Sequence, residues 1–295
     1  MRVLMPVDGS SHNHAALAFL VGRRSWLEAE KPDVELVHVR APLPSRFSEV
    51  FTQEQIRAMH EEAAEEVFAQ LEHEAHFPTL TKKVLVGSPG LEIAQEAADT
   101  KADLIVVGAR GHGFIDSMLV GSVSQAVIAK SDKPVLICHD VPAPEKESLV
   151  VGVAVDGSGS SDAALDFIIR HKTFFGPDAE FRILYAVPDY QGIMQKHLVG
   201  AMMRFIPEIP TIETEDFREV TDPVVEKFAA AGIKATPVML KGEAGPAIVD
   251  YAERELGIIV AGSHGKGNLR ALFMGTTARH IAALTRCPML VVRGS

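Results

Sequence analysis

The sequence predicts an α/β protein with two tandem, doubly wound domains, each built on a five-stranded parallel sheet of strand order 3-2-1-4-5. The first observation is an internal repeat: residues 3–11 match residues 150–161, and residues 104–113 match residues 258–267. The second is the length of 295 residues, which suits two domains of about 150 residues each. The third is a regular alternation of apolar runs with segments of helical periodicity.

The two copies differ in length in their middle. Asp8 and Asp156 are 148 residues apart (156 − 8), whereas Gly108 and Gly262 are 154 residues apart (262 − 108). The second copy therefore carries a net insertion. The segment 141–147 (VPAPEKE), rich in proline and charge, is the predicted linker between domains 1–140 and 148–295.

Near-continuous runs of Val, Ile and Leu in each copy are typical of strands covered on both faces, as in parallel α/β sheets. Sequential strands of this kind are joined by crossover helices, which predicts about four helices per copy. The runs lie at 3–7, 34–39, 83–86, 104–108 and 134–138 in the first copy, and at 149–155, 181–187, 237–240, 258–262 and 288–292 in the second.

Helical spacing is clearest in residues 53–75, where Ile56, Ala63, Val67 and Leu71 are expected on one core-facing side. The middle segments 41–55 and 188–215 look irregular and are expected to lie over a site or to contact a partner. The closing strands of the two copies are exposed-edge candidates that are expected to pair with each other. One chain would then be a pseudo-dimer, and two such chains are expected to form a homodimer.

Composition excludes several classes of function. The chain has 29 Lys and Arg against 39 Asp and Glu, a net charge of −10, which disfavours a nucleic-acid partner. No apolar run approaches the length of a membrane span. Asp8 places a charge where the apolar core of a signal peptide would have to form, which disfavours a signal peptide. The two cysteines, Cys138 and Cys287, are too few for a disulfide scaffold, and His pairs lack a third ligand for a metal. We therefore expect a cytoplasmic protein without a membrane or metal site.

The strongest chemical signal is the motif G-x2-G-x9-G-[ST], which occurs once in each copy. Its first glycines follow a buried strand, and its Gly-Ser or Gly-Thr pair opens a helix, so that two loops rich in N–H groups converge on one anion. The alternative is that the glycines only make turns and the Ser or Thr only caps a helix. The motif residues are Gly108, Gly111, Gly121 and Ser122, and then Gly262, Gly265, Gly275 and Thr276.

Basic and acidic groups flank these loops. Near the glycines lie the basic residues Arg110, His112, His264, Lys266 and Arg270, which favour a phosphate in an otherwise acidic chain. Asp8 and Asp156 each follow the first strand of a copy, beside the switch point at which an open α/β sheet binds its ligand. Each carboxylate could accept from adenine or ribose, or only stabilise its turn.

On the segments VDGS, the repeated glycine motif, and the closing SDKPVLIC and TRCPMLVV, both copies resemble universal stress protein domains over nearly the whole chain. The resemblance implies a domain that often binds ATP and assembles through its last strand. It implies that Pro6, Asp8 and Val39 flank the adenine and ribose, and that Gly108, Arg110, Gly111, His112, Gly121, Ser122 and Val123 hold the phosphates. In the second copy the implied set is Asp156, Val187, Gly262, His264, Gly265, Lys266, Gly275, Thr276 and Thr277, with Ala154 in place of Pro6.

Three functions stay open on this basis. The leading one is an ATP-binding regulatory protein of the stress response, with the nucleotide in one or both domains and no catalytic residues. The second is slow ATP hydrolysis or phosphotransfer with Mg²⁺, in which Asp8 and Ser122, or Asp156 and Thr276, supply the machinery. The third is a docking module in which the motif is purely structural.

Overall fold

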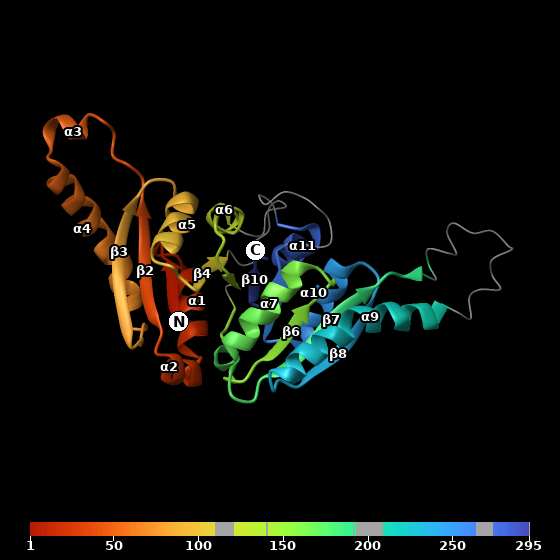
Figure 1. Ribbon diagram of the computed structural model, residues 1–295. Coiled ribbons are helices and arrows are strands. Elements are labelled where there is room, and N and C mark those ends of the chain that lie inside the picture. Colours follow the sequence, from red (N-terminus) through yellow and green to blue (C-terminus); the bar gives the residue numbers. More distant parts are fainter. Residues whose placement is uncertain (110–120, 140, 191, 193–208, 264–273, 295) are drawn as a thin grey trace.

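The computed structural model describes the chain except for residues 110–120, 140, 191, 193–208, 264–273 and 295. It contains one ten-stranded sheet of order β3-β2-β1-β4-β5-β10-β9-β6-β7-β8, with helices on both faces (Figure 1). Each half of the chain thus has the predicted order 3-2-1-4-5, and within each half neighbouring strands are parallel. The predicted fold class is confirmed.

The first half runs from β1 to β5. Its strands are β1 (Arg2–Pro6), β2 (Asp33–Arg40), β3 (Thr79–Val86), β4 (Leu104–Ala109) and β5 (Val135–His139). Its helices are α1 (Ser11–Val21), α2 (Arg24–Glu30), α3 (Phe47–Val50), α4 (Gln53–Glu72), α5 (Pro89–Asp99) and α6 (Ser122–Lys130).

The second half runs from β6 to β10. Its strands are β6 (Val150–Ala154), β7 (Glu180–Val187), β8 (Ala235–Lys241), β9 (Ile258–Gly262) and β10 (Met289–Val292). Its helices are α7 (Gly159–Arg170), η1 (Lys172–Phe175), α9 (Ile209–Ala230), α10 (Ala244–Glu255) and α11 (Thr276–Leu284).

Two apolar layers cover the two faces of this sheet. One layer contains Leu17 of α1, Phe68 of α4, Ile168 of α7 and Phe228 of α9. The other is built by α5, α6, α10 and α11. Each central strand is therefore buried on both faces, which explains why its sequence reads as a continuous apolar run.

The two halves join through β5 and β10, which pair antiparallel: Val135 lies opposite Val291, Leu136 opposite Leu290, and Ile137 opposite Met289. This confirms the pairing expected between the closing strands. The segment 141–147 also contacts the first half, because the Arg23 guanidinium donates to the backbone carbonyls of Lys146 and Glu147.

The structure corrects three details of the prediction. In α4, Ala63 is exposed, and the buried stripe is His60, Ala64, Phe68 and Leu71. Alanine buries too little apolar area to decide a helix face, whereas the much larger Phe68 does decide it. Residues 41–55 and 188–215 are not wholly irregular, since they contain α3 and the first residues of α4 and α9. Strand β3 begins at Thr79, because an edge strand with exposed Thr and Lys side chains shows no apolar run there.

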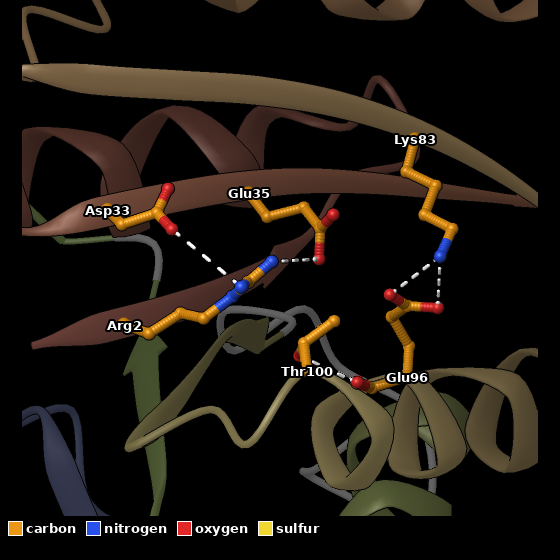
Figure 2. Close-up of polar contacts among 6 residues, drawn as sticks. All are labelled: Arg2, Asp33, Glu35, Lys83, Glu96 and Thr100. Atoms are coloured by element: carbon orange, nitrogen blue, oxygen red, sulfur yellow. Dashed lines mark hydrogen bonds and ion pairs between the residues drawn. The ribbon is translucent and has the colours of Figure 1, made fainter.

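A cluster of charges, with the buried carboxylates Glu35 and Glu96 at its centre, lies between β1, β2, β3 and α5 (Figure 2). Arg2 lies 3.8 Å from Asp33 and 3.9 Å from Glu35, while Lys83 Nζ donates to both carboxylate oxygens of Glu96, at 2.8 and 2.7 Å. The cluster thus holds three carboxylates against two cations. Burial, followed by the charge of Glu96, raises the pKa of Glu35.

We predict that Glu35→Gln increases the free energy of unfolding at pH 7.5. A raised pKa in the folded state means that protonated Glu35 stabilises the fold, and that this contribution is lost as the pH rises through that pKa. The gain should therefore shrink as the pH falls towards about 4.3, the usual pKa of glutamate. Urea unfolding at both pH values measures it, with the exposed Glu28→Gln as control; an equal change in both variants would contradict the prediction.

Candidate functional site

The candidate site of each half lies at the carboxyl edge of its central strands. Strand β1 pairs with β2 on one side and with β4 on the other, so the strand order reverses between β1 and β4. The same reversal separates β6 from β9. Crevices outside the carboxyl ends of strands at such a switch point are where open α/β sheets bind ligands. We call these places the first and the second crevice.

The loop after the first strand of each half makes a tight turn on a glycine. Gly9 has a φ of +79° and Gly157 a φ of +71°, a left-handed conformation that side chains disfavour. In the first loop, Asn13 Oδ1 accepts from the N–H groups of Asp8 (2.9 Å) and Gly9 (3.1 Å). The turn is thereby held by α1, which starts two residues after Gly9.

Asp8 and Asp156 both take part in these turns. The Ser10 N–H donates to Asp8 Oδ1 at 3.0 Å, and the Ser158 N–H donates to Asp156 Oδ1 at 3.0 Å. Asp156 Oδ1 also accepts from the Ser161 hydroxyl at 2.9 Å. Asp8 is exposed, and Oδ2 of Asp8 accepts no hydrogen bond from the described residues, whereas Asp156 is half-buried. The turn role of both carboxylates is thus established, and Asp8 keeps one oxygen open.

Gly108 is required by packing. A Cβ at this position would lie 2.6 Å from the backbone carbonyl oxygen of His12, because α1 crosses close to the end of β4. The hydroxyl of Ser124, in the first turn of α6, donates to the carbonyl of Gly108 at 3.4 Å. The end of β4, the start of α1 and the start of α6 therefore converge at Gly108. Its counterpart Gly262 is the last residue of β9.

The helix starts predicted from the motif are confirmed. Gly121 is the N-cap of α6, which begins at Ser122, and Gly275 is the N-cap of α11, which begins at Thr276. A Cβ on Gly121 would meet nothing within 4 Å in the described chain, and no side chain caps this helix there. Ser122 and Val123 are exposed, as are Thr276 and Thr277. The first N–H groups of an α-helix have no partner within the helix, so they are available to an anion.

The register of the strands corrects one equivalence between the copies. The carbonyl oxygen of Arg40 accepts from the N–H of Gly87, the residue after β3, and the carbonyl oxygen of Val187 accepts from the N–H of Gly242, the residue after β8. Val187 is therefore the counterpart of Arg40. The residue that matches Val39 is therefore Ala186. The connection between β6 and β7 is one residue shorter than that between β1 and β2, and a shift of one residue moves a side chain to the other face of a strand. Pro6 is matched by Ala154, as expected.

Several predicted site residues fall outside the described part of the chain. These are Arg110, Gly111, His112, His264, Gly265, Lys266 and Arg270.

Sequence reasoning missed two pairs of residues beside the crevices. Asn13 and Ser161 occupy matching positions, five residues after each aspartate, and each bonds to its turn. His38 and Tyr185 also match; the buried His38 Nδ1 lies 2.7 Å from the carbonyl oxygen of Val7. A polar residue at the same distance after both VDGS segments was the available signal for the first pair. No local pattern marks the second pair, because both residues sit inside apolar strands.

Acidic side chains surround Tyr185 beside the second crevice. Burial raises the pKa of Tyr185, and the charges of Asp216, Asp156 and Glu219 raise it further. The Tyr190 hydroxyl donates to Asp216, a residue of α9. A negatively charged ligand would meet this acidic side of the second crevice.

Other chemistry receives no support from the described residues. Burial raises the pKa of both thiols, Cys138 and Cys287, so each stays protonated and unreactive. No group of three or more His, Cys, Asp or Glu side chains there is arranged to hold a metal ion. None of the described helices combines the length and apolar character that a membrane crossing requires.

Comparisons with known proteins identify the relatives of this chain. The model of the universal stress protein family matches residues 1–139 and again residues 149–293. A universal stress protein of Mycolicibacterium smegmatis is 24% identical, covering 99% of this chain and 96% of its own length. One from Thermus aquaticus is 35% identical over 46% of this chain and 96% of its own. The crystal structure of a universal stress protein from Archaeoglobus fulgidus has a TM-score of 0.67 at 20% identity, covering 100% of this chain and 98% of that one.

The contrast between two motif glycines is testable through stability. We predict that Gly108→Ser lowers the free energy of unfolding by about 1–3 kcal/mol, because the new Cβ overlaps the backbone of His12. Gly121→Ser should change it by less than about 0.5 kcal/mol, because its Cβ enters open space and serine is a good N-cap. Urea unfolding of the two variants measures both effects. Equal destabilisation by both substitutions would show that the packing at Gly108 is misassigned.

Proposed function

The chain belongs to the universal stress protein family, and on this premise we propose that it is a regulatory protein that binds ATP. The nucleotide would occupy one or both of the matched crevices. Binding there would bias the conformation or the assembly of the chain in response to stress.

One observation carries this proposal: a Cβ on Gly121, at the start of α6, would meet nothing within 4 Å among the described residues. The open space at Gly121 and the unpaired N–H groups that follow it suit a phosphate group. Such helix N-termini bind anions through N–H groups and through the positive end of the helix dipole. The end of β4 at Gly108, which lies close to both α1 and α6, supports a phosphate site at the start of α6.

The roles of individual residues follow from their places. In the first crevice, Asp8, Pro6 and Val39 would contact the nucleoside, with Asp8 Oδ2 accepting from a ribose or adenine group. Gly121, Ser122 and Val123 would hold phosphates through their N–H groups. In the second crevice the matching residues would be Asp156, Ala186, Gly275, Thr276 and Thr277. Mg²⁺ would arrive with the triphosphate as part of the ligand.

The residues outside the described part complete the proposed sites. Arg110, Gly111 and His112 would join the first crevice, and His264, Gly265 and Lys266 the second. We also keep the proposals of a cytoplasmic protein and of a homodimer of tandem chains. Because β5 and β10 pair within one chain, a homodimer would have to use another surface.

The first test addresses the phosphate assignment. We predict that Gly121→Val weakens ATP binding roughly tenfold or more, because the side chain would occupy the phosphate position and remove charge-assisted hydrogen bonds. Titration calorimetry measures the affinity and the number of sites, and Gly275→Val tests the second crevice separately. Thermal unfolding shows that each variant is folded. If a folded double variant binds ATP as tightly as the natural chain, the phosphate assignment is wrong.

The second test separates a regulatory role from catalysis. We expect labelled ATP with Mg²⁺ to remain intact in a single-turnover experiment with excess protein, because phosphoryl transfer requires a positioned base and a held metal. Product is measured by chromatography over several hours. Formation of ADP that disappears in Asp8→Ala would overturn the regulatory proposal in favour of slow hydrolysis.

A further inference from the structure

A cavity unrelated to the two crevices lies between residues 42–47, α4 and β3. Its volume is about 590 Å³, within the range of about 300–1,000 Å³ that is usual for small-molecule sites. It is lined by Pro42, Leu43, Pro44, Ser45, Phe47, Gln53, Ile56, Arg57, His60, Glu61, Lys82, Lys83, Val84 and Val86.

Much of this wall is apolar and open to water. Leu43, Ile56 and Val84 line the cavity, and the side chains of Phe47 and Val86 are 37% and 43% exposed. Exposed apolar surface of this kind gains free energy when a ligand covers it. The cavity therefore favours a ligand with a hydrocarbon part.

His60 provides a polar group inside the cavity. The residue is only 5% exposed, and its ring forms no hydrogen bond with the described residues. The nitrogens of this ring are not among the buried polar atoms that are sealed from water. A ligand in the cavity can therefore bond to the ring without displacing a hydrogen bond of the fold. His60 is therefore suited to fix the polar end of a ligand.

Comparison of the two halves shows that the fold does not require His60. Phe68-Ala69 in α4 and Phe228-Ala229 in α9 are equivalent, since both phenylalanines are buried in the same apolar layer. Counting back from them, His60 corresponds to Val220, a residue packed against that layer. The first half has thus placed an imidazole where the second half has an ordinary apolar side chain.

The same divergence occurs on the adjoining strand. Arg40 lies opposite Val86, and its counterpart Val187 lies opposite Lys241, so Val86 corresponds to Lys241. Four residues earlier in each strand, Lys82 therefore corresponds to Pro237. By the same count, Lys83 corresponds to Val238. Two polar positions of the cavity, His60 and Lys82, are therefore apolar in the other copy, which favours a role in binding a ligand. The divergence at Lys83 is explained by its ion pair with Glu96.

The two lysines of the cavity, Lys82 and Lys83, differ in how readily they could bind a ligand. Lys83 is held by both oxygens of the buried Glu96 (Figure 2) and is committed to that pair. Lys82 Nζ bonds the exposed carboxylates of Glu65 (3.1 Å) and Glu72 (3.5 Å). Exposed ion pairs contribute about 0–1 kcal/mol, so Lys82 can exchange these partners for a ligand at little cost.

We propose that this cavity binds a small amphipathic carboxylate. Its hydrocarbon part packs against Leu43, Ile56 and Val84, and its carboxylate bonds to His60 and Lys82. The site is independent of the nucleotide proposal, because it shares no residue with either crevice.

Titration calorimetry of the full chain with octanoate, below its micelle concentration, tests the proposal. We expect octanoate to bind more tightly than 1-octanol and octyltrimethylammonium, which have the same chain but no negative charge. His60→Val, which installs the residue of the second half, should weaken octanoate binding roughly tenfold through loss of a charge-assisted hydrogen bond. His73→Val, at an exposed position just after α4, is the matched control and should bind normally.

A second variant tests the location. Ile56→Trp should abolish octanoate binding by filling the cavity, while its melting temperature shows that it is folded. Unchanged binding in folded His60→Val or Ile56→Trp would overturn the proposal, as would equal binding of 1-octanol or of the cation. Gly121→Val should bind octanoate normally, so that failure of the nucleotide proposal leaves this result distinguishable.

Discussion

The rest of the structure depends on the antiparallel pairing of β5 with β10. Leu136 lies opposite Leu290, which is its counterpart in the repeat. On either side, Val135 lies opposite Val291 and Ile137 lies opposite Met289, so a two-fold axis between the two leucines relates the two pairs. The contact is therefore isologous, as in a two-fold dimer, although both partners belong to one chain. It joins two five-stranded sheets and removes the exposed edge that each copy would otherwise present. Among the described strands, β3 and β8 lie at the two edges of the sheet.

Within each half, helices cover both faces of the sheet, and in the first half the crevice lies where helices from the two faces meet at the end of β4. The close crossing of α1 over the end of β4 brings the turn of Asp8 next to Gly108. The start of α6 is tied to the same place through Ser124. Three local elements, each marked by glycine or a small polar residue, thus converge only because the strand order reverses between β1 and β4. The two copies then diverge in detail, since Asp156 and Tyr185 give the second crevice a different charge environment.

Much of the fold and part of the site could be predicted from local patterns. The starts of α6 and α11 follow from Gly121-Ser122 and Gly275-Thr276, because a helix start depends on a few neighbouring residues. The prediction for the buried face of α4 was wrong at Ala63 and omitted His60, because periodicity weights an alanine like a large side chain. The match of Val187 to Val39 was also wrong, because strand register is set by hydrogen bonds to another strand.

The sequence by itself determined the duplication, the strands and their order, the pairing of the closing strands, and the glycine-marked helix starts. These properties depend on composition and spacing within short segments, which a linear reading contains. Only the tertiary structure decided that Gly108 is required by the backbone of His12, that the turns occupy Asp8 and Asp156, and that His60 faces a cavity beside β3. Each of these depends on contacts between residues that are brought together by packing, and packing acts on distances in space rather than along the chain.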